Sequence, residues 1–490
     1  MRDDQIAAVL REANPWWLAA AMGRSPTEWT ASHRLLRDRG RYDLGYRSNV
    51  LDDVAKGPVD DKLVVLTGPR RVGKSIALID AAAALCARDD VDPRQVIHVP
   101  ADDFSAADLG RAFVLGRDLT SSVDRPEPRR RVWLLDEVSG IPGWTATLKR
   151  LRDQTLAGDD TVIATGSRWV GVEDVTANLF AGRAGSGAHR RIRHMFPMSF
   201  RDFLMASGRN LPAPPPAPLW DLQSATVRDQ VEALTFLVDD YDLAWQAYLR
   251  SGGFPRAVFE AVTDGAVSQG YLRDLEAWLV ADVGPDDTPD SVALLLDALA
   301  ARTTSPLNLT KTARDLGYGT RQQFDRRVKR LIATFAAIEC PQRDERGAVI
   351  GGAQAKYYLS DPILAWLPSR LRAGLAEPDL TALTEATIGT TLALALENQQ
   401  EGRLAFGDTI GYLRTDSGKE VDLCPVAVAT AGGTGTTTPI ESKWVARGWR
   451  AEAKVIEGKY QGGVLATRNI LDLSERAWAV PAPLIALLLR

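Results

Sequence analysis

One segment constrains the fold of this chain more than any other. An apolar run, Leu63–Thr67, leads into the residues Gly68 to Ser75, which fit the pattern G-x-x-x-x-G-K-[ST], and a helix-like run, Ile76–Cys86, follows. Glycines let backbone amides curl around a phosphate chain, while the lysine reaches the β- and γ-phosphates and the serine ligates Mg²⁺. A Gly-rich strand-to-helix turn without a ligand is the alternative. We predict a nucleoside triphosphate site, with ATP and Mg²⁺ as cofactors, made by Gly68, Pro69, Arg70, Arg71, Val72, Gly73, Lys74, Ser75 and Ile76.

A second segment supports the first. Arg131–Glu137 is a buried-strand run that ends in two carboxylates. In an ATPase with such a phosphate loop, Asp136 would hold Mg²⁺ through water and Glu137 would polarise the attacking water. The alternative is an ordinary acid pair at a helix start. Ser167, just after the next strand, is our candidate for sensing the γ-phosphate.

Arg183 follows another helix-like segment. Such an arginine can cross a subunit interface and stabilise charge that develops on the γ-phosphate. This interpretation predicts a homo-oligomer. A solvated surface charge is the alternative, and Arg190, Arg191 and Arg193 are rival candidates.

The strand-like runs alternate with helical stretches along this part of the chain, at Leu63–Thr67, Val96–Val99, Val132–Asp136 and Val162–Thr165. That alternation predicts an α/β fold with a parallel sheet covered by helices and the nucleotide outside the carboxyl ends of the strands. With 490 residues the chain is too long for one core, so we expect about three domains. The net charge of -4 excludes a globally basic nucleic-acid binder but leaves local basic patches open.

Composition also bears on location. No apolar run reaches the ~20 residues of a membrane helix, and the first residues lack a signal-peptide core. Cys86, Cys340 and Cys424 are far apart with no CxxC spacing, which argues against a disulfide framework or a zinc site. We expect a cytoplasmic protein with reduced thiols and no membrane partner.

The middle of the chain contains a stiff Pro-rich connector, Leu211–Pro218, followed by helical residues 223–249 that we interpret as a lid. Residues 309–316, a short Gly turn and residues 320–333 have helix-turn-helix spacing, with Thr320 as N-cap of the second helix. Lys356–Leu359 would follow as a wing strand. DNA contact is the functional interpretation, and a solvated face or protein contacts are the alternatives. The basic residues of the second helix are Arg321, Arg326, Arg327, Lys329 and Arg330.

The last hundred residues show a second chemical pattern. An acid, Asp422, lies on one strand-like run, and Glu441 and Lys443 lie on the next, beyond a Gly/Thr-rich loop at 430–438. Strand side chains alternate, so Glu441 and Lys443 share a face. Two carboxylates can hold Mg²⁺ while the lysine positions water for phosphodiester hydrolysis. A surface Glu/Lys pair is the alternative.

These motifs occur together in an order that resembles a branch of the AAA+ ATPases of archaea and bacteria. The segments that carry the resemblance are Gly68–Ser75, Leu134–Val138, Gly143-Trp144, Leu148-Lys149, Thr165–Ser167, Ala181–Arg183, Phe196–Leu204 and Ser251–Pro255. The resemblance implies a winged helix and a C-terminal PD-(D/E)xK nuclease-like α/β domain, in which Glu385 takes the position of an additional acid beside Asp422, Glu441 and Lys443. Such folds can lose cleavage and retain DNA binding. The expected parts are an N-terminal helical segment (1–55), an ATPase core (56–210), a helical lid (219–282), a winged helix (288–370) and the nuclease-like domain (378–490).

The leading hypothesis from the sequence is a Mg²⁺-dependent ATPase coupled to binding and processing of duplex or branched, Holliday-junction-like DNA. Whether its C-terminal nuclease-like domain cleaves DNA is left open by the sequence. The alternative is an NTP-controlled signalling or defence switch that binds protein and has a vestigial nuclease domain. A third hypothesis is a sequence-specific repressor with an ATPase.

Overall fold

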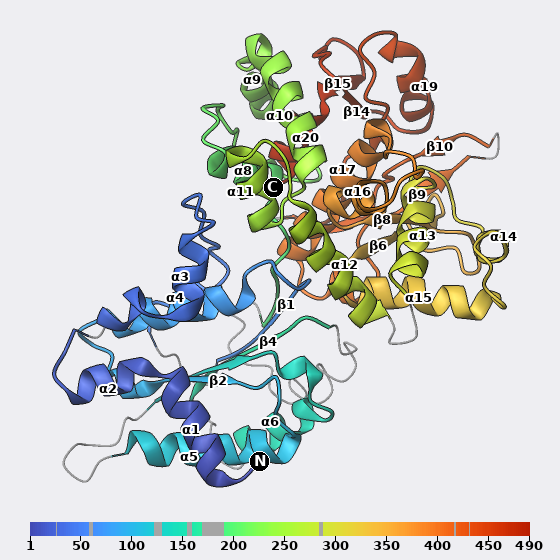
Figure 1. The fold of residues 1–490 in the computed structure, drawn as a ribbon. Helices are drawn as coiled ribbons and strands as arrows, with labels where there is room; N and C mark the ends of the chain where they lie inside the picture. Colours follow the sequence, from blue (N-terminus) through green and yellow to red (C-terminus); the bar gives the residue numbers. More distant parts are fainter. Residues whose placement is uncertain are drawn as a thin grey trace. The chain divides into compact units, whose positions relative to one another are not determined.

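The structure is a computed structural model that describes residues 1–25, 27–57, 62–121, 130–153, 159–168, 191–283, 288–415, 418–430 and 432–490 (Figure 1). It divides into two compact units, Met1–Phe196 and Pro197–Arg490. Within the described ranges, no helix is both long enough and apolar enough to cross a bilayer. All three cysteines are buried free thiols.

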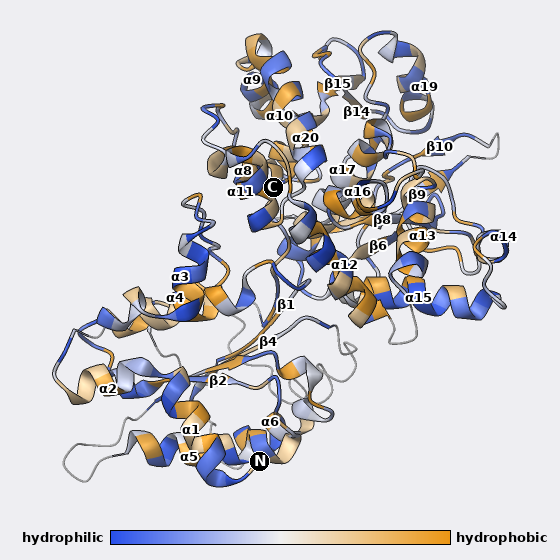
Figure 2. Ribbon diagram, viewed as in Figure 1, coloured by the Kyte–Doolittle hydropathy of each residue, from blue (hydrophilic) through white to orange (hydrophobic). Residues whose placement is uncertain are grey.

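The first unit is built on a five-stranded parallel sheet in the order β2-β3-β4-β1-β5. Its strands are β1 (Leu63–Thr67), β2 (Val96–Pro100), β3 (Val132–Asp136), β4 (Thr161–Gly166) and β5 (Ile192–His194). The four predicted strands and their parallel pairing are confirmed. The three-residue β5 was not predicted because it is too short to show a pattern. Side chains of β1, β3 and β4 are buried throughout, as expected for a parallel sheet covered on both faces. Figure 2 shows the hydropathy of the same residues, with apolar ones in orange.

Helices cover both faces of this sheet (Figure 1). The helix α4 (Lys74–Cys86) packs on one face together with α3 (Arg34–Gly40). On the other face lie α1 (Asp3–Ala13), α5 (Ala106–Thr120) and α6 (Trp144–Asp153), whose apolar residues join one core with those of the strands. In that core Phe113 stacks on Trp133 with ring centroids 4.1 Å apart.

The N-terminal segment packs against the edge strand β2. The Asn14 side chain accepts from the backbone N–H of His98 (2.6 Å) and donates to its carbonyl (2.8 Å). The helix α2 (Pro15–Ala21) and the short helix η1 (Glu28–Ala31) follow, and the indole N–H groups of Trp16 and Trp17 both donate to the Val96 carbonyl. These bonds satisfy backbone groups that an uncovered edge strand would leave unpaired.

The second unit begins with helices. They are α8 (Phe200–Ala206), α9 (Ala225–Glu232), α10 (Val238–Ser251), α11 (Pro255–Thr263), α12 (Gln269–Val283) and α13 (Pro289–Ala300). The Pro-rich segment forms neither helix nor strand, as predicted. It lies inside this unit, because the Tyr241 hydroxyl donates to the Pro212 carbonyl and the Ala217 N–H donates to the Leu488 carbonyl.

Two further helices, α14 (Leu309–Asp315) and α15 (Arg321–Ala333), are joined by a short turn as predicted. The Thr320 side chain accepts from the Gln323 N–H (3.2 Å), which confirms the predicted N-cap. The strands β6 (Ala337–Cys340) and β8 (Lys356–Leu359) follow as an antiparallel pair, and α16 (Pro362–Leu371) comes next.

The C-terminal part combines a long helix, α17 (Leu380–Gln399), with several small sheets. Strands β7 (Gln342–Arg343), β9 (Tyr412–Arg414) and β10 (Glu420–Val421) form one sheet, and β13 (Ile440–Ser442), β14 (Gly463–Thr467) and β15 (Ala477–Pro481) form a parallel one. The helices α18 (Arg403–Phe406), α19 (Trp449–Lys459) and α20 (Ala482–Leu489) complete it.

The prediction of a loop over 430–438 was wrong in part. Strand β12 (Gly433–Thr436) pairs with β11 (Ala427–Thr430) in an antiparallel hairpin. The glycines and threonines of β12 do not alternate between apolar and polar residues, which is the pattern that would predict a strand. The strand is therefore specified by its backbone pairing with β11.

Candidate functional site

The loop between β1 and α4 is shaped by residues with unusual backbone angles. Gly68 has φ +151°, and a Cβ there would overlap the carbonyl oxygen of Met195, so only glycine fits. Gly73 has φ 103° and is the N-cap of α4, and Arg71 also has a positive φ of 69°. Side chains of Arg70 and Arg71 are exposed. The loop therefore turns its backbone tightly around the start of α4, as phosphate binding requires.

Lys74 is the first residue of α4 and is 4% exposed. Its Nζ donates to the carbonyls of Gly68 (3.0 Å) and Pro69 (2.9 Å) and lies 3.7 Å from Oε1 of Glu137. Burial lowers the pKa of Lys74, while the attraction of Glu137 and Asp136 opposes that shift. The ammonium is thus held at the centre of the loop with one partly exposed carboxylate near it.

The carboxylate of Asp136 and the backbone of Glu137 are held by a residue that the sequence did not indicate. Leu135 pairs with Ala164 across the sheet, which sets Asp136 beside Thr165. The Thr165 hydroxyl donates to Oδ1 of Asp136 (2.7 Å) and accepts from the Glu137 N–H (3.0 Å). Glu137 has φ 55°, a left-handed conformation that is uncommon for glutamate.

The γ-phosphate sensor predicted at Ser167 lies two residues beyond Thr165 and is 2% exposed. Its role stays a prediction. The signal that could have identified Thr165 is its place at the carboxyl end of β4, directly beside the end of β3.

Two further residues come from the end of β2, which aligns with the end of β3. Nε2 of His98 lies 4.0 Å from Oδ2 of Asp136, and burial lowers the pKa of His98. Burial, together with the nearby charges of Glu137 and Asp136, raises the pKa of Asp102. In the sequence, His98 lies just before the end of a predicted strand and Asp102 just after it. No motif marks either residue as part of a site.

The donor set at this edge of the sheet fits Mg²⁺. Ser75 supplies a half-buried hydroxyl in the first turn of α4, and Asp136 supplies a buried carboxylate oriented by Thr165. Hydroxyl and carboxylate oxygens are the ligands Mg²⁺ takes, with phosphates and water completing its shell.

Arg183 and its rival Arg190 lie outside the described residues. Another rival, Arg193, has its guanidinium in other contacts. It donates to both carboxylate oxygens of Asp53 (2.6 and 2.7 Å) and to the Val50 carbonyl (2.6 Å).

The second unit brings together the four residues predicted for a nuclease-like centre. Glu385 comes from α17, Asp422 follows β10, Glu441 lies in β13 and Lys443 comes just after β13. Nζ of Lys443 lies 2.7 Å from Oε1 of Glu441 and 3.6 Å from Oδ2 of Asp422. Oε2 of Glu441 accepts from the Asp422 N–H at 3.1 Å.

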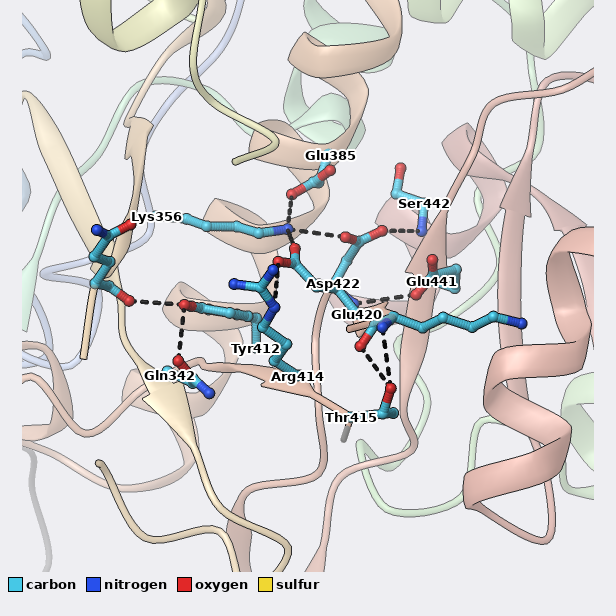
Figure 3. Close-up of polar contacts among 12 residues, drawn as sticks. Gln342, Lys356, Glu385, Tyr412, Arg414, Thr415, Glu420, Asp422, Glu441 and Ser442 are labelled. Atoms are coloured by element: carbon cyan, nitrogen blue, oxygen red, sulfur yellow. Dashed lines mark hydrogen bonds and ion pairs between the residues drawn. The ribbon is translucent and has the colours of Figure 1, made fainter. Parts of the chain in front are cut away.

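A fifth residue, Lys356 of β8, joins this cluster and was missed as a member of it. Figure 3 shows its ammonium between Glu385 and Asp422. Nζ lies 3.0 Å from Oε1 of Glu385, 2.9 Å from Oδ1 of Asp422 and 3.5 Å from Oε2 of Glu420. The Tyr358 hydroxyl donates to the same oxygen of Glu385 (2.8 Å).

The cluster is deeply buried, and this changes its protonation. Burial and the charge of Asp422 raise the pKa of Glu385 to about 8 and that of Glu441 to about 7. Burial opposes ionisation of Asp422, but Lys356 and Lys443 outweigh it and hold its pKa below the usual value. Burial likewise disfavours the charged form of Lys356, yet Asp422 and Glu385 prevail and raise its pKa.

A divalent cation does not fit this arrangement. Oε1 of Glu385 and Oδ1 of Asp422 both accept from Nζ of Lys356. The other pair of acids, Asp422 and Glu441, has Nζ of Lys443 at 3.6 and 2.7 Å. In the part of the chain that the structure describes, no group of three or more His, Cys, Asp or Glu side chains is placed to hold a metal ion.

Several basic side chains of helix α15, which the sequence predicts to contact DNA, make contacts within the protein instead. Arg330 donates to the Val283 carbonyl (2.7 Å), Lys329 pairs with Asp325 (2.8 Å), and Arg327 lies over the Tyr318 ring at 5.0 Å. The two remaining members of the predicted set, Arg321 and Arg326, have exposed side chains.

Comparison with known proteins agrees with the geometry of the first unit. A family model described as an AAA domain matches residues 60–204. The chain thus carries an AAA-type P-loop ATPase domain. No curated protein matches the chain. A solved structure titled "the Walker-type ATPase PABY2304 of Pyrococcus abyssi" is similar over 67% of this chain and 95% of that chain, with 18% identity and a TM-score of 0.34.

Proposed function

We propose that the chain hydrolyses Mg²⁺-bound ATP at the carboxyl ends of β1, β3 and β4. The observation that carries this proposal is the position of Thr165, which orients Asp136 and Glu137 beside the buried Lys74. A hydroxyl, two acids and a lysine at the mouth of a phosphate loop are the parts that ATP hydrolysis needs.

Each residue has a distinct role in this proposal. The loop amides and Lys74 bind the phosphate chain, and a phosphate oxygen competes with the Gly68 and Pro69 carbonyls for the ammonium. Ser75 and Asp136 hold Mg²⁺, which when bound neutralises charge on the phosphates. Glu137 accepts a proton from the attacking water, and its carboxylate lies 3.7 Å from the Lys74 ammonium of the loop.

We further propose that ATP turnover is coupled to DNA. The order of α13, α14 and α15, followed by the antiparallel pair β6 and β8, supports a winged helix. Arg321 and Arg326 are the cations best placed for phosphate contact, because their side chains are exposed. A cytoplasmic homo-oligomer in which Arg183 completes a neighbouring site belongs to the same proposal.

One observation favours the alternative, an NTP-controlled switch with a vestigial nuclease domain. Lys356 occupies the position between the acids of the nuclease-like cluster, so DNA cleavage has no support there. A protein that binds DNA without cutting it, or binds a protein partner, is compatible with this arrangement.

ATP turnover of the full-length chain tests the proposal. Lys74→Ala should abolish hydrolysis, whereas Lys454→Ala, which removes an exposed lysine of α19, should leave it intact. Turnover that survives Lys74→Ala would refute the site.

Turnover and gel shifts with single-stranded, duplex and four-way-junction DNA then test the coupling. Stimulation that falls in an Arg321→Ala/Arg326→Ala variant supports DNA as the partner. The absence of a shift with any DNA at low salt would favour the switch.

A further inference from the structure

The carboxylate cluster of the second unit already contains a cation. Lys356 is completely buried, and the side chains of Glu385 and Asp422 are only 3% and 5% exposed. Its ammonium makes hydrogen bonds of 3.0 and 2.9 Å to these two acids and lies 3.5 Å from a third, Glu420. Three acidic side chains from α17 and from the β10 segment thus surround one ammonium, two of them through hydrogen bonds.

This geometry is that of an ammonium ion and is unsuited to a small metal ion. Mg²⁺ binds oxygens at about 2.0–2.1 Å in an octahedron and usually keeps several waters. Oxygens set 2.9–3.0 Å from a central nitrogen, in a buried cluster, do not provide those distances. A metal could enter only if the lysine left.

The surrounding contacts hold Lys356 in place. The Tyr358 hydroxyl, also from β8, donates to Glu385 (2.8 Å), and the Ser442 N–H donates to Oδ2 of Asp422 (3.0 Å). Lys356 also lies over the Tyr412 ring at 5.4 Å. Both acids are therefore oriented by several donors toward the ammonium.

We propose that the Lys356 ammonium is the resident cation of this cluster, so the second unit takes no divalent metal there and does not hydrolyse DNA. The cluster instead fastens strand β8 to α17 and to the end of β10. This inference goes beyond ATP hydrolysis and does not depend on it.

Manganese binding and DNA nicking by the full-length chain test the proposal directly. Mn²⁺ is titrated without nucleotide and followed by electron paramagnetic resonance, and supercoiled plasmid is incubated with Mg²⁺ or Mn²⁺. The wild type and Glu441→Gln should bind the same number of Mn²⁺ ions, and neither should nick the plasmid. One bound Mn²⁺ or a nicking activity that Glu441→Gln loses would overturn the proposal.

A gain-of-binding variant provides the second arm. In Lys356→Ala the vacated acids should accept Mn²⁺, which should raise the midpoint of thermal unfolding. The rise should be absent in the wild type and in Lys454→Ala, the control that removes an exposed ammonium of α19 and leaves the cluster intact. A folded Lys356→Ala without this rise would contradict the role given to Lys356. If that variant does not fold, the first comparison decides alone: equal binding supports the proposal, and lost binding refutes it.

Discussion

The hydroxyl of Thr165 makes two contacts that a single substitution removes. Thr165→Val keeps the size of the side chain but loses the bond to Oδ1 of Asp136 and the acceptor for the Glu137 N–H. Thr165 is only 1% exposed, so water cannot readily replace either bond. The variant should leave both acids in the site but without their common anchor.

The size of the effect follows from these bonds. A hydrogen bond to a charged group contributes about 1.5–3 kcal/mol. Because each 1.36 kcal/mol of barrier is a factor of ten, turnover should fall about 10- to 150-fold if this energy serves to position the acids in the transition state. The KM for ATP should change little, since Thr165 contacts the acids and not the phosphate loop.

Steady-state ATP hydrolysis measures kcat and KM separately. Thr165→Ser, which keeps the hydroxyl, should restore most of the turnover. Thr147→Val, at a buried threonine of α6, is a matched control for the change of residue type and should retain kcat. A Thr165→Val protein with the kcat of the wild type would refute the positioning role. A purely structural role would lower stability without the loss of kcat.

Three other predictions concern stability, each measured by urea unfolding of the full-length chain. Lys356→Met strands two buried acids and should cost about 3–5 kcal/mol, and a loss below 1 kcal/mol would contradict the ion-pair geometry. Asn14→Ala removes two bonds to the edge strand β2 and should cost about 1–3 kcal/mol, and an unchanged unfolding midpoint would contradict that role. Burial raises the pKa of Asp361 to about 7 from 3.8. Its protonated form therefore stabilises the fold at acidic pH, and this contribution fades as the pH rises through about 7. Asp361→Asn should remove that trend, and a trend that persists would assign it to other groups.

Sequence patterns anticipated most of the regular structure. The buried runs of β1, β3 and β4 and the capped helix α15 are specified locally, by apolar periodicity and by a threonine at the right position. The hairpin of β11 and β12 is specified by backbone pairing between two adjacent segments, and the short β5 by pairing with β1, which is distant in the sequence. Their own side chains therefore gave no signal.

In both candidate sites, the sequence indicates the residues that belong to motifs and not the residues that contact them from elsewhere in the chain. The residues predicted from motifs do gather, as Asp422, Glu441 and Lys443 show. Thr165 and Lys356 were not assigned to a site because their partners lie 28–29 and 29–66 residues away. Lys356 was expected in a wing strand, and only the packing of β8 against α17 reveals that its side chain enters the acid cluster.

Each unit contains a buried lysine close to acidic side chains, but the hydrogen-bond acceptors of the two ammonium groups differ. Lys74 donates to two neutral carbonyls and has its nearest carboxylate at 3.7 Å, so much of its charge remains available to an anion beside the N-terminus of α4. Lys356 donates directly to Glu385 and Asp422, and the ionised Asp422 neutralises its charge within the cluster. Pyrophosphate should therefore raise the thermal unfolding midpoint of the wild type, and Lys74→Ala should lose that rise while Lys454→Ala keeps it. Stabilisation that persists in Lys74→Ala would place the anion elsewhere and refute the assignment of this loop.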